Sequence, residues 1–173
     1  MYSDFINVMI DFDPSYQMIS AGDDMATYNF EYVDPGITFG YYTDVYKKEL
    51  FALGVGGEFM MGRKSKYDEA IFALHSLYIA PTFVVDDRIN VFTRIGYSLV
   101  NTDTSDDSFN ALSNGINIGT GFRVKLTDNY AVAFEYIYHE HDGVLNEVHY
   151  DFKYNRYGIT LSYGLNLLEN IDD

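Results

Sequence analysis

The sequence predicts an all-β protein in which eight antiparallel strands form a closed up-and-down barrel. Five segments alternate apolar with small or polar residues at a period of two, which is the side-chain spacing of a strand. Short and long connections alternate between the segments, as in a meander whose tight turns all lie at one end. No run approaches the roughly 20 consecutive apolar residues that a membrane-spanning helix needs.

The first two expected strands are the least regular. They cover residues 5–19 and 28–42, and a proline interrupts each of them, at Pro14 and at Pro35. Because proline cannot donate a hydrogen bond to a neighbouring strand, we expect a bulge or another irregularity at both places.

The other six expected strands cover residues 50–61, 70–85, 89–100, 116–126, 130–138 and 156–165. Short turns are expected at 43–48, 85–88 and 126–129, and long polar connections at 19–27, 62–69, 101–114 and 139–151. We expect one domain over residues 1–165 and a short polar tail over 166–173. The amino terminus lacks the basic start, apolar run and cleavage site of a signal peptide, so we expect that either the protein is not exported or the numbering begins at a mature form with an added Met1.

Alternation alone leaves open which face points outward. A soluble ligand-binding barrel would bury its apolar face, whereas a transmembrane barrel would turn it toward lipid. The other face mixes small residues with charges, which suits a narrow lumen better than a solvated exterior. Aromatic residues lie near the ends of the apolar faces, and each face spans about ten residues, as a tilted membrane-crossing strand requires. We therefore predict a transmembrane barrel.

Composition excludes several classes of function. Lys and Arg number 11 against 26 Asp and Glu, so the net charge of −15 argues against binding nucleic acid. The chain has no cysteine, which excludes disulfides and thiolate metal sites.

The last third of the chain resembles a known family. The stretch GINIGTGFRVKLTDNYAVAFEYIYH, residues 115–139, is similar to the sixth and seventh strands of OmpA/OmpX-like outer-membrane proteins. Arg156, Gly158, Leu161 and Tyr163 resemble the carboxy-terminal signal read by the barrel assembly machinery. The resemblance implies a bacterial outer-membrane protein among lipid and lipopolysaccharide, with a structural or surface-interaction role carried by four loops that could bind an extracellular ligand. A small channel for ions or solutes is the alternative.

Charges within the strands predict a plug in the lumen. Buried charges must be paired, because an isolated one costs several kcal/mol or changes its protonation. We expect an ion-pair network that fills the lumen, made by Glu58, Arg94, Arg123, Lys125, Glu135 and Arg156. An eight-stranded barrel is barely wide enough for side chains, which favours packing over a gated conduction path.

The histidines are weak candidates for a metal site. His139 and His141 fall on one face of an extended segment, and a third ligand would have to come from Asp142, Glu147 or His149. A solvated loop is the alternative. In lipid A deacylases of the PagL kind a His-x-Ser pair stands near this strand, but here His141 takes the place of the serine. Because the nucleophile is missing, we do not expect this activity. No nucleophile elbow, phosphate loop or paired-carboxylate motif stands out elsewhere, so we expect neither an enzyme nor a cofactor.

Overall fold

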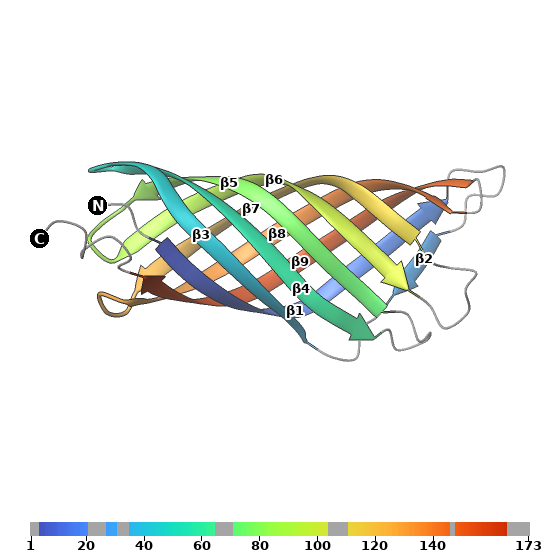
Figure 1. Cartoon of the computed structure of the whole chain (residues 1–173), viewed down its shortest axis with the longest axis horizontal. Coiled ribbons are helices and arrows are strands. Elements are labelled where there is room, and N and C mark those ends of the chain that lie inside the picture. The colour runs from blue at the N-terminus through green and yellow to red at the C-terminus, as the bar shows by residue number, and fades with distance from the viewer. Residues whose placement is uncertain are drawn as a thin grey trace, which may run out of the picture.

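The chain forms a closed antiparallel barrel (Figure 1). The computed structural model describes residues 4–20, 27–30, 35–64, 71–103, 111–145 and 148–165. Its strands are β1 (Asp4–Ser20), β2 (Thr27–Phe30), β3 (Gly36–Lys48), β4 (Phe51–Lys64), β5 (Ile71–Val84), β6 (Ile89–Asp103), β7 (Ala111–Lys125), β8 (Tyr130–Leu145) and β9 (Val148–Leu165). No helix of membrane-crossing length and apolarity occurs in these residues.

Eight positions around the barrel wall accommodate the nine strands. β2 and β3 both pair with β1, so together they fill the second position, and the pairing of β1 with β9 closes the wall. The register of β1 against β9 shifts between Phe12 and Ser15, on either side of Pro14, and β3 begins at Gly36, directly after Pro35, which is not part of a strand. The predicted eight-stranded barrel and both proline irregularities are confirmed.

The strands extend past their apolar segments, which corrects two expected connections. The turn expected at 43–48 is part of β3, and the chain reverses at Glu49 and Leu50 instead. The long connection expected at 139–151 is mostly strand, because β8 and β9 stay paired up to Leu145 and Val148. The strand ends remain paired because backbone hydrogen bonding between strands does not need an apolar face, so the pairing continues beyond the apolar pattern.

The strands are staggered as in a closed barrel. Following paired residues from Ser162 through β1 and onward around the wall leads back to β9 at Phe152, ten residues from the start. Strand number and stagger together set the tilt and width of a barrel, and eight strands leave room only for side chains. In Figure 1, β1 begins and β9 ends at the left, the end that holds the short turns.

The apolar residues face outward. Leu77 is 73% exposed and Ile95 52%, whereas the inward-facing Arg94 is 2% exposed and Arg156 is fully buried. The exposed apolar side chains include Ile6, Ile10, Phe39, Val55, Phe59, Ile79, Val91, Ile116, Ile118, Phe122, Phe134, Ile159 and Leu161. Apolar side chains outside and charged ones inside are the arrangement of a barrel solvated by lipid.

Candidate functional site

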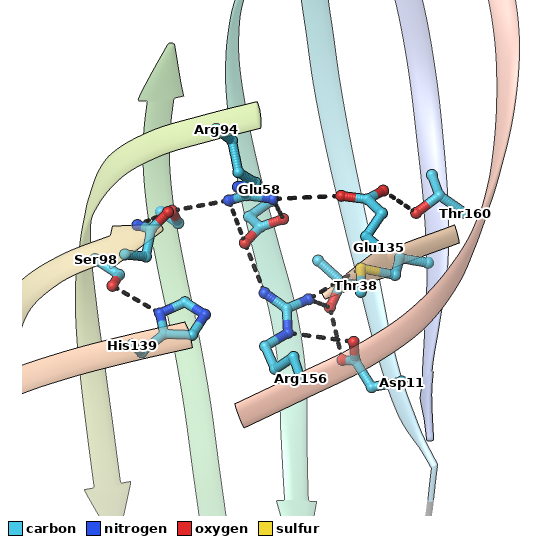
Figure 2. A network of polar contacts seen from close by, with 12 residues as sticks. Asp11, Thr38, Glu58, Arg94, Ser98, Glu135, His139, Arg156 and Thr160 are labelled. Carbon is cyan, nitrogen blue, oxygen red and sulfur yellow. Dashed lines mark hydrogen bonds and ion pairs between the residues drawn. The ribbon is translucent and has the colours of Figure 1, made fainter. Parts of the chain in front are cut away.

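Glu58 binds two arginines at the centre of the barrel (Figure 2). Glu58 extends inward from β4, Arg94 from β6 and Arg156 from β9. Arg94 donates from Nη1 to Oε2 at 3.0 Å and from Nη2 to Oε1 at 2.9 Å, the two-pronged geometry that a guanidinium and a carboxylate prefer. Arg156 donates from Nη1 to Oε1 at 2.7 Å. One carboxylate therefore partners two cations.

Arg156 finds oxygen acceptors for all three of its nitrogens. Its Nε donates to Asp11 Oδ1 at 3.2 Å and its Nη2 to Thr38 Oγ1 at 2.9 Å. The side chains of Arg156 and Asp11 are both fully buried. A buried guanidinium whose three nitrogens are all hydrogen-bonded avoids most of the penalty of leaving water.

Arg94 is held on several sides. Its Nη2 donates to Ser76 Oγ at 3.3 Å, and its Cζ lies 3.7 Å from the centre of the Tyr78 ring. Glu135 Oε2 is 3.9 Å from Nη1, and Glu135 also accepts a hydrogen bond from Thr160. Gly119 makes room for this side chain, because a Cβ there would lie 2.8 Å from Arg94 Cγ.

We call this cluster the polar plug; it comprises Asp11, Thr38, Glu58, Ser76, Arg94, Glu135, Arg156 and Thr160. A cavity of about 20 Å³ lies beside the plug and is lined by described residues. A single water molecule needs at least about 10–15 Å³ of such volume, so the cavity holds about one water. The polar plug therefore closes the middle of the barrel.

Four of the six residues predicted for the lumen network meet in the plug, namely Glu58, Arg94, Glu135 and Arg156. Arg123 does not: its Cζ lies 5.1–5.4 Å from the ring centres of Phe5, Tyr42 and Phe92. The expectation for Arg123 was wrong. On the neighbouring strand β6, Arg123 is paired with Asn90, which lies four residues from Arg94 toward the short turns, so its side chain belongs to a different level of the barrel.

Lys125 is also outside the plug, which corrects the expectation for it. Its side chain is 47% exposed at the short-turn end, and Nζ lies 2.8 Å from Oδ1 of Asp128. The hydrogen bond from Lys125 holds the pKa of the Asp128 carboxyl below its usual value. Lys125 lies in the last position of β7, where solvent reaches the side chain.

Sequence reasoning missed Asp11. Its carboxylate is one of the two that Arg156 contacts, and it is fully buried. A signal existed, because Asn7, Met9 and Asp11 alternate with Ile6 and the apolar positions that follow it. The proline just beyond interrupted the pattern.

Two histidines share a serine hydroxyl inside the barrel. Ser98 Oγ lies 3.0 Å from His139 Nδ1 and 2.6 Å from His141 Nε2. All three side chains are at most 1% exposed, so the shared hydroxyl is buried in the barrel interior. Gly115 allows this contact between β6 and β8, since a Cβ there would overlap the His141 backbone.

Among the described residues, neither Asp142 nor His149 joins the histidine pair as a third ligand. Asp142 and His149 are exposed, away from the buried rings, and Glu147 lies outside the described residues. Within the described part of the chain, no group of three or more His, Cys, Asp or Glu residues could hold a metal ion. The reason is the alternation of the strand, which turns Asp142 outward when His141 points inward.

The residues of the predicted assembly signal lie on β9. Arg156 and Gly158 point into the barrel, where Gly158 packs against Met9. Leu161 and Tyr163 point outward and are 48% and 40% exposed. The four residues thus divide between the two faces of one strand. The predicted polar tail at 166–173 lies outside the described residues.

Solved structures share this fold. The crystal structure of Ail, the attachment invasion locus protein of Yersinia pestis, in complex with the heparin analogue sucrose octasulfate has a TM-score of 0.52 at 13% identity and covers 92% of this chain and 99% of that one. Neisserial surface protein A gives 0.51 at 14% identity, covering 92% and 96%. The outer membrane protein Ail in a phospholipid bilayer nanodisc gives 0.50 at 12%, covering 93% and 99%.

The likeness is one of fold. It confirms the resemblance to small eight-stranded outer-membrane barrels that the sequence predicted. No protein-family model matches the chain, and no curated protein matches it either.

Proposed function

We propose that this chain is an integral, non-enzymatic protein of the bacterial outer membrane with a structural or surface-interaction role. The observation that carries the proposal is the combination of a closed lumen and an apolar exterior. The polar plug leaves space for about one water, while the outward side chains suit lipid. A barrel that nothing passes through acts through the surfaces at its two ends.

The end opposite the short turns is the better candidate for a binding surface. Its connections are the longest, and the outer face of the β8–β9 hairpin exposes Glu140, Asp142 and Asp151 beside one cation, Lys153. Ail has been solved with a sulfated ligand. A sulfated ligand would be repelled by this acidic hairpin, so we infer a partner of different charge here.

Replacing the long connections tests the surface role. Residues 21–26, 65–70 and 104–110 are exchanged for short Gly-Ser turns, and cells displaying either form are compared for attachment to matrix-coated surfaces. We expect the variant to lose attachment while its barrel still folds, as judged by a gel-mobility shift on boiling. Equal attachment by both forms would contradict a role for the connections.

A small channel is the second candidate, because the plug consists of charged side chains that could rearrange. Single-channel recordings in planar bilayers separate the two functions. The proposed role predicts no steady conductance from the wild-type chain. Reproducible conductance steps, altered by Glu58→Gln, would favour the channel.

We further propose that Arg156, Gly158, Leu161 and Tyr163 form the signal read by the barrel assembly machinery. Tyr163→Ala should lower the amount of barrel in the outer membrane of cells and leave refolding into detergent unchanged. A matched variant outside the signal, Tyr130→Ala, changes the ring that Tyr163 contacts at 5.1 Å. Equal loss from both variants would assign Tyr163 to packing alone.

A further inference from the structure

Arg123 is an inward-facing cation that has no anionic partner within the described part of the chain. Among the described residues it has neither a hydrogen bond nor an ion pair, and its Nε is buried with no acceptor. The rings of Phe5, Tyr42 and Phe92 surround the guanidinium instead. Rings stabilise the charge, and no described protein group accepts a hydrogen bond from its five N–H donors.

A cavity of about 320 Å³ opens beside Arg123 at the short-turn end of the barrel. Its walls are partly apolar and include Phe5, Ala52, Ala131 and the phenol ring of Tyr42. The volume corresponds to roughly ten water molecules at about 30 Å³ each. It is at the low end of the range of small-molecule sites, so it fits a ligand the size of a single ring.

Most carboxylates that line this cavity already accept hydrogen bonds from neighbouring residues. Asp44 accepts from the Tyr42 hydroxyl at 2.7 Å, and Asp86 accepts from two backbone N–H groups of its own turn at 2.7 Å. Asp128 accepts from Lys125 at 2.8 Å. The guanidinium in the barrel interior is therefore available to a ligand, while Asp86, Asp87 and Asp128 make the rim acidic.

We propose that this cavity binds a monocarboxylate with a small apolar body, whose carboxylate pairs with Arg123. The fork of the guanidinium matches a carboxylate with two parallel hydrogen bonds. The apolar walls take the body of the ligand. The acidic rim disfavours a dianion such as phosphate, because like charges repel. This site lies at the opposite end from the proposed binding surface and does not depend on it.

The test is a titration of 4-fluorobenzoate into the protein refolded in detergent micelles, followed by fluorine NMR against a micelle blank. We expect saturable binding to the wild-type protein and to Lys153→Gln, a matched control that removes a partly exposed charge paired with Glu140, far from the cavity. Binding to Arg123→Gln should be at least about tenfold weaker, since a charge-assisted pair is lost. Each variant is checked for folding by its mobility shift on boiling.

A second comparison needs no variant. The neutral analogue 4-fluorobenzamide should bind the wild-type protein at least about tenfold more weakly than the carboxylate, for the same reason. Absence of saturable binding by 4-fluorobenzoate, equal binding of the two probes, or undiminished binding to Arg123→Gln would overturn the proposal. Displacement of 4-fluorobenzoate by an equal concentration of inorganic phosphate would overturn the assignment to monocarboxylates.

Discussion

Two arginine environments differ sharply inside this barrel. In the polar plug, Arg94 and Arg156 share Glu58, and Arg156 also contacts Asp11. Nearer the short turns, Arg123 contacts three aromatic rings and no carboxylate among the described residues. An inward-facing arginine therefore closes the lumen in the polar plug, whereas nearer the short turns an inward-facing arginine lines an open cavity.

This difference indicates that the position of a charged side chain along the barrel axis determines whether it must pair with protein groups or can be solvated by water. Midway along the barrel no bulk water is available, so each guanidinium must find acceptors in the protein. At the open end, water within the cavity can solvate the group, and rings suffice to position it. If this is correct, the two layers respond differently to matched substitutions.

Arg156→Met should have the largest effect. It removes the cationic partner from a fully buried ion pair with Asp11, at a cost of about 3–5 kcal/mol in the free energy of unfolding. The measurement is the urea midpoint of the heat-modifiable band in detergent. A midpoint close to that of the wild-type protein would mean that the plug contributes little to stability.

Ser98→Ala should have the next largest effect. It leaves one ring nitrogen each of His139 and His141 without the hydroxyl that they share, at a cost of about 1–2 kcal/mol, because buried polar groups are left unsatisfied. The same urea titration measures it. Ser98→Thr retains the hydroxyl and serves as the control; equal losses from both variants would point to packing rather than hydrogen bonding.

Gly119→Ala should destabilise the plug by overpacking. The added Cβ would lie 2.8 Å from both Arg94 Cγ and the Tyr136 carbonyl oxygen, so the backbone must shift, at about 1–2 kcal/mol. Gly164→Ala is the matched control, because its nearest neighbour would be Phe5 at 3.5 Å, an ordinary contact. Equal midpoints for the two variants would show that Gly119 is not needed for space.

Arg123→Met should change stability little. Its ring contacts contribute less than about 1 kcal/mol at a partly solvated site, and removal of an unpaired charge offsets part of that loss. Set beside Arg156→Met, this variant tests the comparison directly. A loss as large as that of Arg156→Met would mean that Arg123 has a structural partner.

Lys125→Gln should leave the unfolding midpoint unchanged, because exposed ion pairs contribute little to stability. It should still raise the pKa of Asp128 toward the ordinary value, since the lysine holds that pKa down. The stabilisation that comes from a lowered carboxyl pKa is fully present above the pKa of the same group in the unfolded chain. It is lost as the pH falls through the pKa of the group in the folded state. Carbon-13 NMR of the Asp128 carboxyl measures the shift, and an unchanged pKa would contradict the contact.

Much of the fold could be predicted because the period-two pattern is written directly in the sequence. The pattern places Glu58, Arg94 and Arg156 on the inward face, and burial costs then require them to pair. What the pattern does not contain is the stagger between strands. Arg123 lies four residues along β7 from Gly119, the strand-pairing partner of Arg94. At roughly 3.3 Å per residue, this separation along the strand is about 13 Å.

The ends of the strands could not be predicted for a related reason. Outside the lipid both faces of a strand can be polar, so β8 continues through His139 and His141 without any alternation to reveal it. The Ser98 contact with these histidines depends on Gly115, which pairs with both Ser98 and His141 across two interfaces. Only the register brings such distant residues together.

The central claim is that apolar side chains face lipid while the charges close the lumen. The most direct test is to refold the chain into detergent micelles and compare boiled with unboiled samples by gel electrophoresis, beside a sample refolded in plain buffer. We predict a mobility shift on boiling, a β-type circular dichroism spectrum and no soluble folded protein without detergent. A chain that folds in plain buffer and shows no shift would contradict the account, because its apolar faces would then have to point inward.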